Sequence, residues 1–115
     1  MIKPYLEDLP GAKFLGVFEG ADWHEIRSQG IGGSELGTIL GLNPWESAYT
    51  LFHKKLGNID YSVANSWAIR FGNAFERPIL DLYSEEHPDE EIFTTGTFRN
   101  TENEWMHANP DAIAK

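Results

Sequence analysis

The chain has 115 residues, a formal net charge of −9 and no cysteine. This length suits one domain with a modest core, and the lack of cysteine excludes disulfides, thiolate zinc sites and iron–sulfur clusters. The acidity argues against a general nucleic-acid binder, although it permits an enzyme that gathers carboxylates around divalent cations. No apolar run approaches the roughly 20 residues of a membrane span, and no signal peptide is evident. We therefore expect a cytoplasmic protein with no membrane partner.

The first elements in the chain are short. Residues 13–20 predict one strand. A helix is expected to begin at Asp22, because Glu25 follows it at the spacing of a capping box. Three glycines then fall within residues 30–33, which is too many for the interior of a helix. Ser34 stands after them, at or near the N-cap of a second short helix.

Two further helices are predicted in the middle of the chain. One spans residues 47–57, with a serine as its N-terminal cap and a glycine at its end. After a loop over residues 58–66, a longer helix is expected from Trp67 to about Glu86, since apolar residues recur there at spacings of three and four. Pro78 falls inside this helix and should kink it or mark its effective start.

The C-terminal part predicts β-structure. Residues 92–98 and 104–109 are strand candidates joined by the turn-rich segment 99–103, and residues 112–114 are the start of a third strand. The chain is thus expected to have an α+β fold, in which N-terminal helices pack on a β-hairpin or partial mixed sheet.

Four residues are candidates for chemistry. Arg27, the glycines and Ser34 have the composition of a phosphate pocket, although a Gly-rich turn with a capping serine and a solvated arginine has the same sequence. Glu76 lies at the edge of the helical stripe, either as a metal ligand or as a boundary residue paired with a neighbouring arginine. Asp111 follows a proline at a strand end, either as a ligand for a hard cation or as a turn residue.

The order of these segments resembles the N-terminal part of a known family. "WHEIRSQGIGGSELGTILGLNPWES", "LFHKKLG", "RFGNAFERPILDLY" and "TFRNTENEWMHANPDAI" are similar to the YqaJ-type viral recombinases, which include phage lambda exonuclease and belong to the PD-(D/E)XK nuclease superfamily. The resemblance covers about residues 22–115. It implies that residues 1–115 form one domain, which is the N-terminal portion of a restriction-endonuclease-like core.

The resemblance assigns roles to the candidate residues. Arg27 and Ser34 match the residues that contact the terminal DNA phosphate. Glu76, in a G-x-x-x-E pattern, and Asp111, in the Pro-Asp motif, match residues of a Mg²⁺ or Mn²⁺ site. Asn109 stands where the family commonly has serine. The family's catalytic acid-x-Lys tripeptide has no match before Lys115, so we expect an incomplete domain.

The implied function is metal-dependent hydrolysis of duplex DNA from 5′-phosphorylated ends during phage-type recombination. Double-stranded DNA ends, a single-strand annealing protein and a homotrimer are the implied partners. We expect the isolated chain to be inactive, because it carries two of the acidic ligands and no acid-x-Lys lysine. One alternative is a non-catalytic module that binds DNA ends or a protein partner, and the net charge favours the protein partner over DNA. The other is a small acidic helical protein with an accidental likeness.

Overall fold

The structure is a computed structural model that describes residues 2–59 and 67–115. Its helices, in chain order, are α1 (Gly20–Ser28), α2 (Gly33–Ile39), α3 (Ala48–Lys55) and α4 (Trp67–Glu86). Its strands are β1 (Lys3–Pro4), β2 (Ala12–Gly16), β3 (Ile92–Thr94), β4 (Thr97–Asn100), β5 (His107–Ala108) and β6 (Ile113–Ala114). The predicted α+β class is confirmed. Most of the loop predicted over residues 58–66 lies outside the described residues.

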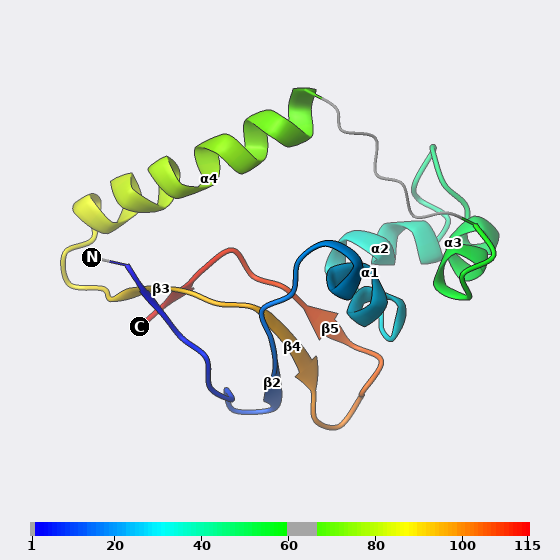
Figure 1. The fold of residues 1–115 in the computed structure, drawn as a ribbon, viewed down its shortest axis with the longest axis horizontal. Coiled ribbons are helices and arrows are strands. Elements are labelled where there is room, and N and C mark those ends of the chain that lie inside the picture. The colour runs from blue at the N-terminus through cyan, green and yellow to red at the C-terminus, as the bar shows by residue number, and fades with distance from the viewer. Residues whose placement is uncertain (1, 60–66) are drawn as a thin grey trace.

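The strands form two small sheets, and the chain passes directly from the first sheet to the second between β3 and β4 (Figure 1). In the first sheet β3 pairs with β1 in parallel and with β6 in antiparallel orientation. In the second, β4 lies between β2 and β5 and is antiparallel to both. The prediction of a single strand over residues 92–98 is wrong, because Thr95 and Gly96 separate β3, in the first sheet, from β4, in the second. At Gly96 a β-carbon would collide with the Gly16 carbonyl, so the crossing strand requires glycine here.

Side chains from several elements make a small core. Phe98 of β4 is 4% exposed and meets Phe14 of β2 edge to face at a ring-centroid distance of 5.5 Å. Leu51 of α3 and Ile92 of β3 are also buried. Because fully burying such a side chain contributes about 1.5–3 kcal/mol, the contact of Phe98 with Phe14 stabilises the pairing of β4 with β2.

The helix starts differ in how well the sequence predicted them. Ser47 caps α3 as expected, since its Oγ accepts a hydrogen bond from the Thr50 N–H at 3.2 Å. The capping box expected at Asp22 is wrong: α1 begins two residues earlier, at Gly20, and Asp22 lies in its first turn. Gly20 has a φ of +59°, in the left-handed region, so the glycine turns the chain into the helix.

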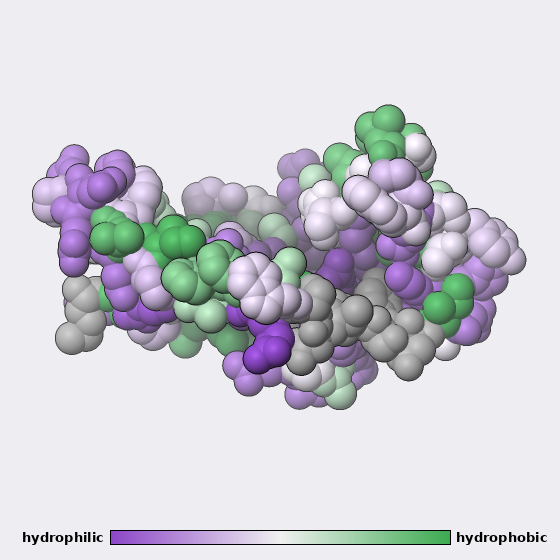
Figure 2. Space-filling view, turned by 90° about the horizontal axis from the view of Figure 1, so that it is seen from above, coloured by the Kyte–Doolittle hydropathy of each residue, from purple (hydrophilic) through white to green (hydrophobic). Residues whose placement is uncertain are grey.

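The long helix α4 runs apart from the other three helices (Figure 1). The rings of Trp67, Phe71 and Phe75 stack in a row along it, with centroid distances of 5.1 and 4.3 Å. No residue of α4 is buried against the rest of the described chain, and Figure 2 shows apolar side chains gathered over this helix. No helix among the described residues is long and apolar enough to cross a membrane.

Candidate functional site

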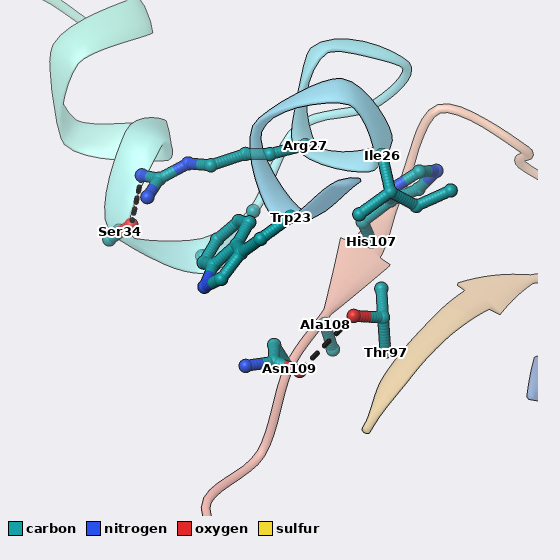
Figure 3. A pocket seen from close by; sticks show the side chains of 10 residues that line it. Trp23, Ile26, Arg27, Ser34, Thr97, His107, Ala108 and Asn109 are labelled. Carbon is teal, nitrogen blue, oxygen red and sulfur yellow. Dashed lines mark hydrogen bonds between the residues drawn. The ribbon is translucent and has the colours of Figure 1, made fainter. Parts of the chain in front are cut away.

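A cavity of about 280 Å³ lies between α1, the start of α2 and strands β4 and β5 (Figure 3). Two of the four candidate residues, Arg27 and Ser34, line it. Its remaining lining comes from both sides: Trp23, Ile26, Gly32, Gly33, Thr97, His107, Ala108 and Asn109. The helical side therefore provides a cation and a hydroxyl, and the strand side provides amide and hydroxyl groups.

Arg27 is oriented by contacts on several sides. Its Nη2 donates to the Ser34 Oγ at 3.4 Å, and its Cζ lies 5.0 Å from the centroid of the Trp23 ring. Trp23 and Arg27 are four residues apart on α1, so they share one face of the helix. The contact between Arg27 and Ser34 is long, which leaves both groups able to bond an incoming anion more closely.

The glycine-rich turn is fixed to the strand side of the cavity. Ile31 donates its N–H to the Trp105 carbonyl at 2.7 Å and accepts from the His107 N–H at 3.0 Å. Gly30 is buried, and a β-carbon there would overlap the His107 ring. The glycine is therefore required by close packing, and it brings α2 and β5 close enough to share one cavity.

A buried carboxylate lies behind the turn. Glu35 is 3% exposed, and its Oε1 accepts from the Gly32 N–H at 2.9 Å and from the Lys55 Nζ at 2.8 Å. Its Oε2 lies 3.8 Å from the Arg27 Nε. Burial alone would raise the pKa of Glu35, but the Gly32 N–H and the two cations outweigh burial and lower it. Glu35 therefore stays ionised beside the cavity.

On the strand side, the residues that line the cavity come shortly before Asp111 in the chain. Thr97 donates its hydroxyl to the Asn109 Oδ1 at 3.1 Å (Figure 3), which holds the Asn109 side chain at the cavity wall. Burial lowers the pKa of the neighbouring His107, so that side chain is neutral at pH 7. Asp111 follows Asn109 by two residues, so their Cα atoms lie within about 7 Å of each other.

The two predicted metal ligands come from separate elements. Asp111 is exposed in the bend between β5 and β6, and Glu76 is exposed on α4. Arg77, a possible partner of Glu76, instead pairs with Asp81 at 3.1 Å. Carboxylates are the donors that Mg²⁺ prefers, so the two residues suit that ion chemically. No group of three or more His, Asp or Glu within residues 2–59 and 67–115 is placed to hold a metal, and metal binding here stays a prediction.

Sequence reasoning missed three parts of this site. Trp23 could have been found from its spacing of four residues from Arg27, and Asn109 from its place beside the Pro-Asp motif. The sequence holds no comparable signal for Glu35, whose partner Lys55 lies 20 residues away. Lys55 lies in the last turn of α3, where the helix dipole alone already favours a positive charge.

The family profile of the YqaJ-like viral recombinase domain matches residues 22–115. A protein of African swine fever virus is 42% identical over 60 residues, which are 52% of this chain and 17% of the viral protein. The YqaJ protein of Bacillus subtilis is 40% identical over 55 residues, which are 48% of this chain and 17% of that protein. Each match thus spans about a sixth of the relative's length, and no solved structure matches the chain.

Proposed function

Because the chain belongs to the YqaJ-like viral recombinase domain family, we propose that its protein is a metal-dependent DNA exonuclease acting at 5′-phosphorylated duplex ends. The observation that carries this proposal is the cavity that Arg27 and Ser34 share with Asn109, two residues before Asp111. A terminal phosphate bound there would place the first nucleotide beside the Asp111 carboxylate.

The residues of the cavity have distinct tasks in this proposal. Arg27 offers a planar fork of N–H donors to phosphate oxygens, and Ser34 offers a hydroxyl donor. Asn109, held by Thr97, lies where the strand of the substrate would leave the cavity. Asp111 and Glu76 would hold Mg²⁺ or Mn²⁺, which when bound polarises a phosphoryl oxygen and lowers the pKa of a water.

Binding to DNA ends tests the anchor without requiring cleavage. Duplexes of one sequence, with either a 5′-phosphate or a 5′-hydroxyl, are titrated with the chain by fluorescence anisotropy. We expect tighter binding of the phosphorylated duplex, because a hydrogen bond to a charged group contributes about 1.5–3 kcal/mol, or roughly 10- to 150-fold. Arg27→Ala should abolish this preference and Ser34→Ala should reduce it. Arg77→Ala, which removes an exposed arginine of α4, is the matched control.

The outcomes separate the proposal from its alternative. Equal affinity for the two duplexes in the unaltered chain would contradict the 5′-phosphate anchor. Binding that is independent of the phosphate and insensitive to Arg27→Ala would favour a module that recognises DNA or a protein in another way. Cleavage is tested separately in Mg²⁺ with the protein that contains this chain. There, Asp111→Asn and Glu76→Gln should each remove cleavage and retain the preference for the phosphorylated end.

The family extends the proposal to partners. Duplex DNA ends are the proposed substrate, and a single-strand annealing protein and a homotrimer are the proposed assemblies. Light scattering after size-exclusion chromatography, with and without DNA, measures the trimer directly. A monomer at all concentrations would remove the oligomer from the proposal and leave the DNA-end site unaffected.

A further inference from the structure

We propose that Lys55 is a positioning residue that keeps the anion cavity positively charged by holding Glu35 away from the Arg27 guanidinium. This inference rests on the proposed function of the cavity as a phosphate anchor. It goes beyond the roles proposed for Arg27 and Ser34, because it concerns the charges of Glu35 and Lys55, and neither of these residues lines the cavity.

The first observation is how the two oxygens of Glu35 are used. Oε1 takes two short hydrogen bonds, from the Lys55 Nζ at 2.8 Å and the Gly32 N–H at 2.9 Å. Oε2 is 3.8 Å from the Arg27 Nε, which is beyond hydrogen-bond length. The carboxylate is thus drawn towards the lysine, and the arginine fork remains directed to Ser34 and the cavity.

The second observation is the position of the Lys55 ammonium. Its Nζ also donates to the Arg27 main-chain oxygen at 2.7 Å, so one group holds both the carboxylate and the helix turn that carries the arginine. The Lys55 side chain is 14% exposed and that of Glu35 is 4% exposed. These buried contacts join α1, α2 and α3 directly behind the cavity.

The charge balance gives these contacts a consequence for binding. Arg27, Lys55 and Glu35 together carry a formal charge of +1, in a chain whose net charge is −9. Without Lys55, the buried carboxylate would need another cation, because an unpaired buried charge is strongly unfavourable. Arg27 is already in contact with it. A full ion pair between them would neutralise the guanidinium and remove the cavity's attraction for phosphate.

The test uses four variants and the 5′-phosphate and 5′-hydroxyl duplexes. Lys55→Met should reduce the preference for the phosphorylated end at least tenfold. Adding Glu35→Gln to Lys55→Met should restore most of it, because no carboxylate then competes for Arg27. Glu35→Gln alone should keep or raise the preference, since glutamine still accepts from the Gly32 N–H. Lys54→Met is the matched control, because Lys54 pairs with Glu46 at 3.0 Å, and it should leave the preference unchanged.

Rescue by the second substitution distinguishes charge from structure. If Lys55 only supported the fold, the double variant would bind no better than Lys55→Met, and that result would overturn the inference. A fall in preference in Glu35→Gln would overturn it as well, even if Lys55→Met failed to fold.

A measurement without DNA separates this inference from the proposed function. Hydrogen exchange of the Arg27 Nε–H is followed by NMR. It should slow in Lys55→Met, as the carboxylate closes on that group, and recover in the double variant. If the unaltered chain shows no phosphate preference, the proposed function fails, and the exchange rates still decide the arrangement of the three side chains. Unchanged exchange in Lys55→Met would refute the positioning role.

Discussion

Gly30→Ala probes the joint between the glycine-rich turn and β5, on which the cavity depends. A β-carbon at Gly30 would overlap the His107 ring, whereas one at Gly33 would meet no atom within 4 Å. Neither glycine has a positive φ, so the substitutions differ in packing and not in backbone strain. The overlap includes the His107 Cγ, which lies close to a backbone whose N–H is bonded to the Ile31 carbonyl at 3.0 Å, so the ring cannot easily move away.

The magnitude follows from opposing effects. Forcing a methyl group into a packed site destabilises a protein by about 1–3 kcal/mol. Replacing glycine restores about 0.4–1 kcal/mol through the unfolded chain. The net loss for Gly30→Ala is thus about 0–2.6 kcal/mol, with a central value of about 1.3 kcal/mol, or roughly 5 °C in the melting temperature for a domain of this size. Gly33→Ala should be neutral or slightly stabilising.

Urea unfolding, monitored by circular dichroism and tryptophan fluorescence, measures both variants. The decisive arm is the His107→Ala background, in which the ring is absent and Gly30→Ala should lose most of its effect. An equal loss in both backgrounds would show that the collision with His107 is not the cause. An equal loss in Gly30→Ala and Gly33→Ala would show that any residue other than glycine disturbs this turn.

Three further predictions test the fold. The lowered pKa of Glu35 means that the unfolded chain takes up a proton at higher pH than the folded one, so stability should fall as pH drops from about 5 to about 3. Glu35→Gln should flatten that part of the urea midpoint curve. Phe98→Ala removes a ring that is 4% exposed and should lower the unfolding free energy by about 3–5 kcal/mol, whereas Phe52→Ala, at 58% exposed, should lower it far less. Ser47→Ala should destabilise α3 by about 1 kcal/mol and Ser47→Asp should not, as judged by thermal melts.

The sequence predicted the features that depend on neighbouring residues. The bounds of α4 and the Ser47 cap were both found, because helix periodicity and capping act over one turn. The third strand at residues 112–114 was also expected, and the structure has β6 there. Local signals were ambiguous at Asp22, where a glycine with a positive φ, and not the acidic side chain, sets the start of α1.

The missed features depend on contacts between distant parts of the chain. The parallel pairing of β1 with β3 joins Lys3 to Phe93, and two residues of β1 have no pattern that reveals it. Arg27 and Ser34 were grouped from composition, and the structure places their side chains in contact, whereas their binding of phosphate stays a prediction. The ion pair of Lys55 with Glu35 could not be predicted, because helix spacing gives no information about which side chains of α2 and α3 meet.

The chain as a whole is acidic, whereas the proposed phosphate-binding cavity is positively charged. This difference determines which DNA-binding measurement is informative. The net charge of −9 opposes the approach of any DNA, and salt screens this effect beyond roughly 8 Å. That repulsion acts on both duplexes, whether the end carries a phosphate or a hydroxyl. In the ratio of the two affinities it largely cancels, so the ratio isolates the proposed interactions of the terminal phosphate within the cavity. Absolute affinity therefore reflects mainly the overall charge of the protein, whereas the ratio reports on Arg27 and the residues that position it.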